Sequence, residues 1–104
     1  MMTHRERVLR KLKLEDKSHS LPVLAKASGV PLSILREVEK RGAGAYVSDP
    51  SSVRMKGTFK KGVNAPMSQK LSQAQWSRAR AYSFLDSVLN GAPKKHDLDL
   101  HARL

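Results

Sequence analysis

The stretch that decides the fold is residues 21–40, which have the sequence LPVLAKASGVPLSILREVEK. It predicts two short helices joined by a tight turn, as in a helix-turn-helix. Ala25 is small enough to lie where the helices cross, and Gly29 stands at the turn, where only glycine adopts a positive φ cheaply. The apolar residues expected to face inward are Leu24, Val30, Leu35 and Val38. The pattern makes nucleic-acid binding the leading hypothesis.

Helix-breaking and capping residues set the limits of this pair. Ser20 and Pro22 mark the start of the first helix, and Pro31 opens the second. Gly42 is predicted to end the second helix, because glycine readily takes the left-handed conformation found after a helix. The helix-turn-helix is therefore expected over residues 21–41.

A first helix is predicted upstream by the capping box T-x-x-E of Thr3 and Glu6, and it should run to about residue 14. Its apolar stripe is narrow and basic side chains surround it. This pattern suits a solvated helix, and it equally allows a helix that tracks phosphates. The basic residues that would make such contacts are Arg5, Arg7, Arg10 and Lys11.

A last helix is predicted by a second capping box, S-x-x-Q at Ser72 and Gln75, and should span about residues 72–89. Trp76 points away from its apolar face, so the preceding segment is expected to cover it. The side chains predicted to face the core are Ala74, Ala81, Phe84, Leu85 and Val88.

The fold class that follows is mainly α, in one basic helical domain over residues 1–91. Residues 42–66 are rich in glycine and basic side chains and show no sustained helical period, so an irregular segment is expected there. Residues 92–104 have no strong pattern, and we expect a loosely attached tail.

Composition narrows the class of partner. The chain of 104 residues carries a formal charge of +11 and is 39% hydrophobic, which suits a modest core and a polyanionic partner such as duplex DNA. The absence of cysteine excludes disulfides and thiolate metal sites. Apolar runs are too short to span a membrane, and the N-terminal residues do not resemble a secretory signal. We therefore expect an intracellular location or packaging inside a particle.

The second helix of the pair would carry any reading of bases. Its exposed residues include Ser33, Arg36 and Lys40, of which Arg36 can contact guanine with two hydrogen bonds. Neighbouring Leu32 and Glu37 are poor for this purpose, because one cannot donate a hydrogen bond and the other repels phosphate. A purely structural helical hairpin, with Leu32 in a protein interface, is the alternative.

A second basic stretch is VRMKGTFKKG, residues 53–62. Its glycines would let backbone amides approach a phosphate, and Phe59 either anchors the loop or stacks on a base. The lysines and arginine predicted to meet phosphate are Arg54, Lys56, Lys60 and Lys61.

Catalytic and metal-binding patterns find little support. Asp97, Asp99 and His101 would share one side of an extended strand, yet such a group in a tail is usually only polar. No nucleophile elbow, paired carboxylates or nucleotide fingerprint is present. We therefore predict no enzyme, no cofactor, no metal and no small-molecule substrate.

Residues 24–89 also resemble a small domain of unknown function found in large DNA viruses and some phages. Three motifs carry the resemblance: RGxGAY after the helical hairpin, SVRxKG, and QWxxARxYSF in the last helix. The resemblance implies a viral origin more than an activity. The matching residues are Gly42, Gly44, Tyr46, Arg54, Lys56, Gly57, Trp76, Arg78, Ala79, Arg80, Tyr82 and Phe84.

Two functional hypotheses remain. The first is a small basic viral DNA-binding protein, largely directed to the backbone, in genome packaging or transcription. The second is a virion structural protein, in the minor capsid or core, that uses the helical hairpin to contact other capsid or core proteins. DNA binding that weakens steeply with salt would favour the first.

Overall fold

The computed structural model describes residues 3–48, 72–92 and 97–104 of the chain. These ranges hold helices and no strand, which confirms the mainly α class. The helices are α1 (His4–Leu12), α2 (Leu21–Ser28), α3 (Leu32–Ser48), α4 (Gln73–Asn90) and α5 (Leu98–His101). No helix in the described ranges has the length and apolar character needed to cross a membrane.

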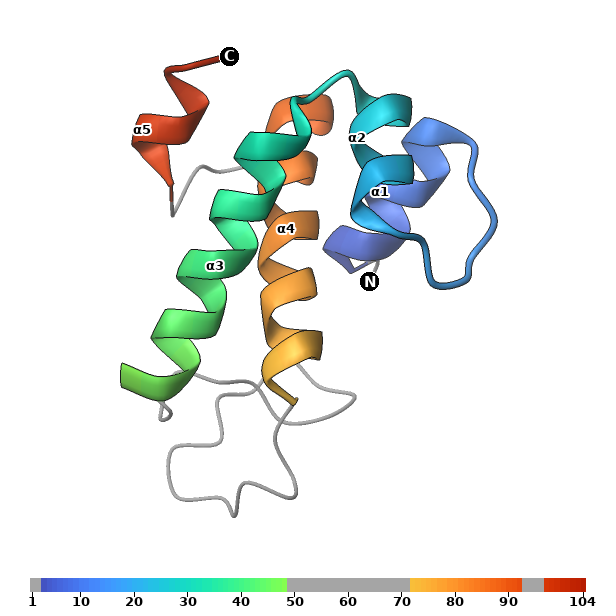
Figure 1. The fold of residues 1–104 in the computed structure, drawn as a ribbon. Coiled ribbons are helices and arrows are strands. Elements are labelled where there is room, and N and C mark those ends of the chain that lie inside the picture. The colour runs from blue at the N-terminus through green and yellow to red at the C-terminus, as the bar shows by residue number, and fades with distance from the viewer. Residues whose placement is uncertain (1–2, 49–71, 93–96) are drawn as a thin grey trace.

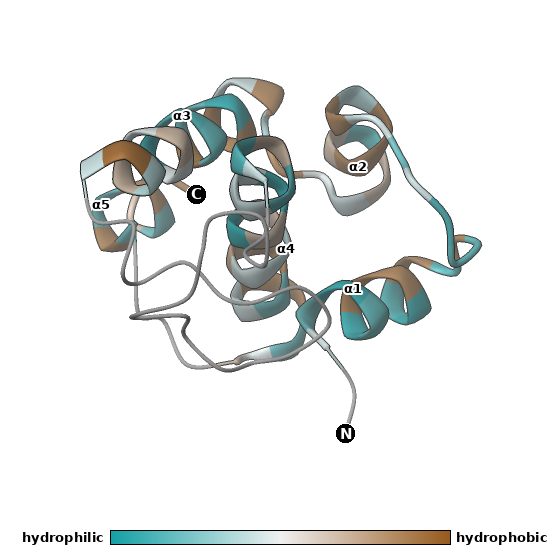
Figure 2. Ribbon diagram, turned by 90° about the horizontal axis from the view of Figure 1, so that it is seen from below, coloured by the Kyte–Doolittle hydropathy of each residue, from teal (hydrophilic) through white to brown (hydrophobic). Residues whose placement is uncertain are grey.

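The central element is α4, which packs against α3 and α1, while α2 packs against α3 (Figure 1). Seen from below, α3 and α1 lie on opposite sides of α4 (Figure 2). One core cluster joins all five helices, with Val8, Leu24, Leu35, Leu85 and Leu100 fully buried in it. Helices distant in the sequence therefore share one apolar interior.

The first predicted cap is present. Thr3 Oγ1 accepts a hydrogen bond from the Glu6 N–H at 3.1 Å and starts α1. Val8 and Leu9 then face the core. The helix ends at Leu12, two residues before the expected limit.

The two helices predicted on either side of Gly29 are present, with a tight turn between them. Gly29 ends α2 at a φ of 77°, and its N–H donates to the Ala25 carbonyl at 2.9 Å. Pro31 comes directly before α3, and its carbonyl accepts from the N–H of Ile34 at 3.0 Å. The four apolar residues expected inside this pair are buried, as is Ala25. The positive φ explains why glycine stands at this turn.

The prediction that Gly42 ends the second helix is wrong, because α3 continues to Ser48. Gly42 is buried where α3 crosses α4, and a Cβ placed on it would lie 3.2 Å from the Ser77 Cα. This glycine therefore serves close helix packing instead of a left-handed turn. The rest of the expected irregular segment, residues 49–66, lies outside the described residues.

The second predicted capping box opens α4 as expected. Ser72 Oγ accepts from the Gln75 N–H at 3.2 Å, and Gln75 Oε1 accepts from the Ser72 N–H at 2.9 Å. Ala81, Phe84 and Leu85 are buried and Val88 is partly buried. The expectation for Ala74 is wrong, because it lies in the first turn of α4 and is exposed beside an open cleft.

Trp76 is half-buried in the second turn of α4. The segment expected to cover it lies mostly in residues 49–71, outside the described ranges. The origin of its cover therefore stays a prediction.

The expectation of a loosely attached tail is wrong for residues 97–104. Leu100 of α5 is fully buried, and the His101 ring stacks on Phe84 with centroids 4.2 Å apart. The sequence pattern missed this helix because it is a single turn long, too short to show a period.

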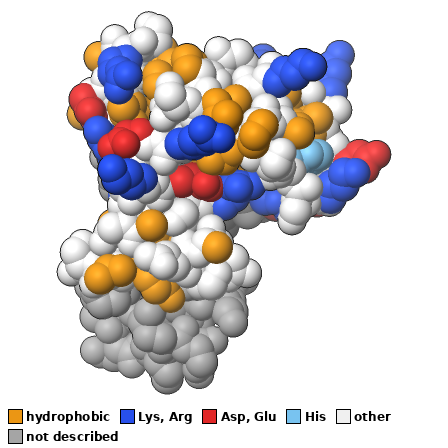
Figure 3. Space-filling model, viewed as in Figure 1, with side chains coloured by type: hydrophobic (Ala, Val, Ile, Leu, Met, Phe, Trp, Pro, Cys, Tyr) orange, Lys and Arg blue, Asp and Glu red, His pale blue; other side chains and the backbone are white. Residues whose placement is uncertain are grey.

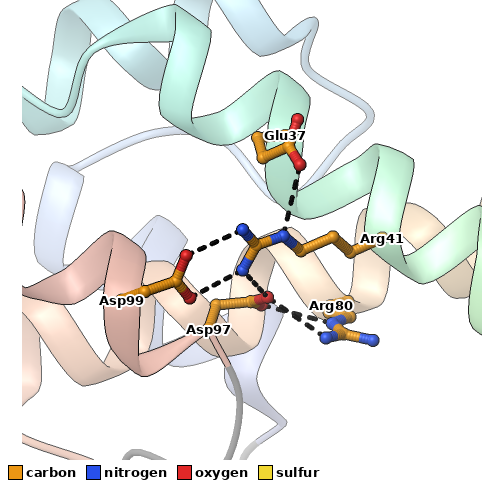
Figure 4. A network of polar contacts seen from close by, with 5 residues as sticks. All are labelled: Glu37, Arg41, Arg80, Asp97 and Asp99. Atoms are coloured by element: carbon orange, nitrogen blue, oxygen red, sulfur yellow. Dashed lines mark hydrogen bonds and ion pairs between the residues drawn. The ribbon is translucent and has the colours of Figure 1, made fainter.

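Two arginines hold this segment through the carboxylates on either side of Leu98 (Figure 4). Arg41 contacts both oxygens of Asp99, at 2.7 and 2.8 Å, and the Asp97 Oδ1 at 3.3 Å. Arg80 of α4 contacts the same Asp97 at 3.1 and 3.2 Å. The hydrogen bonds from Arg41 lower the pKa of Asp99 to about 2. We call these four residues the tail clasp.

Candidate nucleic-acid interface

The exposed face of α3 carries the residues expected to read or hold nucleic acid. Ser33, Arg36 and Lys40 are exposed and recur at intervals of three and four residues, which places them on one side of the helix. Val38 and Gly42 of the same helix are buried, so the stripe faces away from the core. The geometry is that of a helix with one free polar face.

Three neighbours of the stripe are poor for contacts with nucleic acid: Pro31, Leu32 and Glu37. Glu37 lies on the same side of the helix as the stripe, four residues after Ser33 and three before Lys40. Leu32 is partly buried against the core, which also leaves little of it for a protein interface. Glu37 accepts a hydrogen bond from Arg41 at 3.3 Å, so its charge is compensated. Pro31 alone of the three stays exposed. The stripe therefore carries two cations, Arg36 and Lys40, and one carboxylate whose charge Arg41 compensates.

A second set of cations lies near the stripe. Arg10, Lys11 and Lys13 are exposed at the end of α1, and Lys26 is exposed near the end of α2. The ends of α1 and α2 and the start of α3 lie at the same end of the molecule (Figure 1). In Figure 3, Lys and Arg side chains lie at the upper right, over that end, and others are spread across the same face between hydrophobic side chains.

These cations share the absence of an acidic partner in the described ranges. Every aspartate and glutamate there except Glu6 forms an ion pair. Apart from Glu6, the exposed charges that form no ion pair in these ranges are therefore positive. We define the cationic surface as six exposed residues, four at the ends of α1 and α2 and two in the first half of α3: Arg10, Lys11, Lys13, Lys26, Arg36 and Lys40.

Arg5 and Arg7, also expected to hold phosphate, have acidic partners within the protein. Arg5 Nη1 lies 2.7 Å from Asp16 Oδ1, and Arg7 Nε lies 2.8 Å from Asp86 Oδ2. The structure therefore gives both arginines a role in joining segments, and they are not part of the cationic surface.

Asp86 is a fully buried carboxylate that joins α4 to α1. Burial alone would raise its pKa, but hydrogen bonds from His4, Asn90 and Arg7 outweigh burial and leave the pKa below its usual value. His4 Nδ1 lies 2.7 Å from Asp86 Oδ2, and since an ionised carboxylate only accepts, this nitrogen carries the proton. Asn90 Nδ2 donates to the other oxygen at 2.9 Å.

Arg54, Lys56, Lys60 and Lys61, with Phe59, fall outside the described residues. Their expected contacts with phosphate stay predictions. Lys13 and Lys26 are the residues of the cationic surface that were not among the predicted contacts, and Lys26 lies on a helix for which none was predicted. The signal for Lys26 was its position four residues after Pro22, on the exposed side of α2.

The three tail residues considered as metal ligands make other contacts in the structure. Asp97 and Asp99 bind arginines in the tail clasp, and His101 stacks on Phe84. Among the described residues no group of three or more histidines and carboxylates could hold a metal ion.

Comparison with protein families, curated proteins and solved structures found no match to this chain. The resemblance of residues 24–89 to a viral domain therefore stays a prediction. The function proposed below therefore rests on the cationic surface.

Proposed function

We propose that this protein is a non-enzymatic DNA-binding protein that contacts mainly the phosphate backbone. The observation that carries the proposal is the cationic surface, whose six side chains are exposed and lack acidic partners in the described ranges. A solvated cation near phosphates releases condensed counterions, which drives binding without reading sequence. The setting of viral genome packaging or transcription rests on the resemblance of residues 24–89 alone.

Backbone contact is favoured over base reading by the kinds of side chain present. Arg36 is the one residue of the α3 stripe able to form a bidentate contact with guanine. Lysine ammonium groups bind phosphate as point charges, and the hydroxyl of Ser33 suits either a phosphate or a base. We therefore expect modest sequence preference on top of general affinity for duplex DNA.

The first test is a salt titration with duplex DNA. If about five cations meet phosphates, log affinity should fall with log salt with a slope of about −4.5, or roughly 500-fold between 50 and 200 mM. Fluorescence anisotropy of a labelled duplex measures both the affinity and the slope. RNA in a parallel titration tests whether the surface distinguishes the two polyanions.

Alanine variants of exposed cations test which side chains contact the phosphates. Arg36→Ala/Lys40→Ala should lower the magnitude of the slope by about two, because two phosphate contacts are lost. Lys17→Ala is the control, since Lys17 is exposed beside Glu15 in the loop after α1, away from the α3 stripe. If the wild-type protein bound no duplex DNA at low salt, the proposal would fail, and the virion structural hypothesis would remain.

A further inference from the structure

A separate cleft of about 700 Å³ lies between the start of α1 and the first half of α4. The loop between α1 and α2 contributes Ser18 and His19 to its wall. This volume is within the range of small-molecule sites. We call this cleft the α1–α4 cleft, and the lining residues that bear on a ligand are Arg5, Glu6, Ala74, Arg78, Ala79 and Tyr82.

Polar contacts hold the walls of the cleft in place. Arg78 donates from Nε to Glu39 at 2.6 Å and from Nη1 to the His19 carbonyl, which ties the loop to α4. The ion pair of Arg5 with Asp16 ties the same loop to α1. The cleft is therefore a built feature with fixed sides.

Two arginines line the cleft, and each is paired with a carboxylate outside the lining: Arg5 with Asp16 and Arg78 with Glu39. Arg5 and Arg78 come from different walls, and both lie near the Tyr82 hydroxyl. Burial raises the pKa of Tyr82, and the two guanidinium groups partly oppose that shift. Glu6 is the sole acid among the described lining residues, and its carboxylate accepts a hydrogen bond from Thr3 at 3.2 Å.

Both guanidinium groups keep donors for a ligand. An arginine has five N–H donors, and the contacts of Arg78 with Glu39 and His19 use only two. Asp16, the partner of Arg5, has a side chain that is 73% exposed, so water screens this ion pair and an incoming anion can compete with it. Ala74 and Ala79 offer apolar surface beside the two cations.

From this geometry we propose that the α1–α4 cleft binds a phosphate monoester, with the dianion between Arg5 and Arg78 and the organic group along Ala74 and Ala79. Two cations match the two charges of the monoester, and guanidinium groups suit phosphate oxygens. The phosphate can belong to a free small molecule or to the 5′ end of a nucleic-acid strand. The proposal does not depend on DNA binding, because it uses none of the cationic surface.

The probes are adenosine 5′-monophosphate, adenosine, and a duplex with either a 5′-phosphate or a 5′-hydroxyl. Nuclear magnetic resonance of the ¹⁵N-labelled protein follows the backbone amides of His19 and Ala79. We expect shifts at these amides with the monophosphate and none with adenosine at equal concentration. If the source is a strand end, the phosphorylated duplex shifts them at lower concentration than the monophosphate does, whereas the hydroxyl duplex leaves them unchanged.

Variants then assign the contact. Arg5→Gln should weaken monophosphate binding at least about tenfold, the expected effect of losing a charge-assisted contact to a dianion. Arg103→Gln, an exposed cation beyond α5, is the matched control and should bind as the wild type does. The proposal is overturned if neither phosphate probe shifts the wild-type amides at 10 mM, if adenosine shifts them equally, or if the two variants weaken binding alike.

Discussion

Gly42 and Gly44 stand two residues apart in α3, yet they meet opposite surroundings. Gly42 is buried against α4, where an added Cβ would lie 3.2 Å from the Ser77 Cα and 3.4 Å from the Arg80 Cδ. Gly44 is exposed, and a Cβ there would have no atom within 4 Å. Replacing each glycine in turn by alanine therefore isolates the effect of the helix crossing.

The two substitutions should change the free energy of unfolding in opposite directions. Alanine is favoured over glycine inside a helix by about 0.5–1 kcal/mol, and Gly44→Ala should gain all of this. Gly42→Ala gains the same amount but must move the α4 backbone, and overpacking of this kind costs about 1–3 kcal/mol. We expect Gly42→Ala to be less stable than Gly44→Ala by about 1–3 kcal/mol.

Urea unfolding followed by circular dichroism at 222 nm measures both free energies of unfolding. In a heat melt the difference corresponds to roughly 4–8 °C per kcal/mol for a domain of this size. Equal stability of the two variants would refute the argument that Gly42 is required by close packing of α3 on α4. Their helix content should be equal, since both positions lie inside one helix.

Three further predictions concern the anchoring of α5 and α1. Leu100→Ala should lower the free energy of unfolding by about 2–5 kcal/mol, because Leu100 is fully buried. Leu98→Ala is the control, since Leu98 is 60% exposed, and should change the free energy of unfolding by less than about 0.5 kcal/mol. A similar loss at both positions would contradict the packing of α5. The pKa of Asp99 is about 2 in the folded protein and near 3.9 in an unfolded chain, so the stability it contributes is complete above pH 4 and is lost as the pH falls toward 2. Melts of the wild type and Asp99→Asn from pH 5 to 2 should therefore converge in acid, and parallel curves would show that Arg41 does not hold this carboxylate. Asp86→Ala should lower the unfolding free energy measured in urea by about 3 kcal/mol, because Arg7 loses its ion-pair partner and the donors of His4 and Asn90 lose their acceptor. A loss below about 0.5 kcal/mol would contradict that role.

The fold was predictable where one short segment carries its own signal. The capping-box sequences at Thr3 and Ser72 predict where α1 and α4 begin, and Gly29 predicts the turn after α2. Gly42 shows the limit of this reasoning, because a glycine suits both a helix end and a close crossing. Only the presence of α4 decides between the two, and that partner is more than thirty residues away.

Some features of the candidate site were likewise predictable from the local sequence, and others were not. The exposure of Arg36 and Lys40 follows from the helical period and was predictable. The pairing of Arg7 with Asp86 was not, since 79 residues separate the two. Nothing in the local sequence distinguishes an arginine that holds a distant carboxylate from one that is free to meet phosphate.

The pairing of α1 with α4 also affects how the chain emerges during synthesis. Arg7 and Asp86 are 79 residues apart, so at translation rates of roughly 5–20 residues per second, Asp86 of α4 is synthesised about 4–16 s after Arg7 of α1. During that interval Val8 and Leu9 face the cell without their final cover. The cations that surround this stripe keep the nascent helix hydrated and repel other nascent chains of the same kind, which reduces the risk of aggregation on the ribosome.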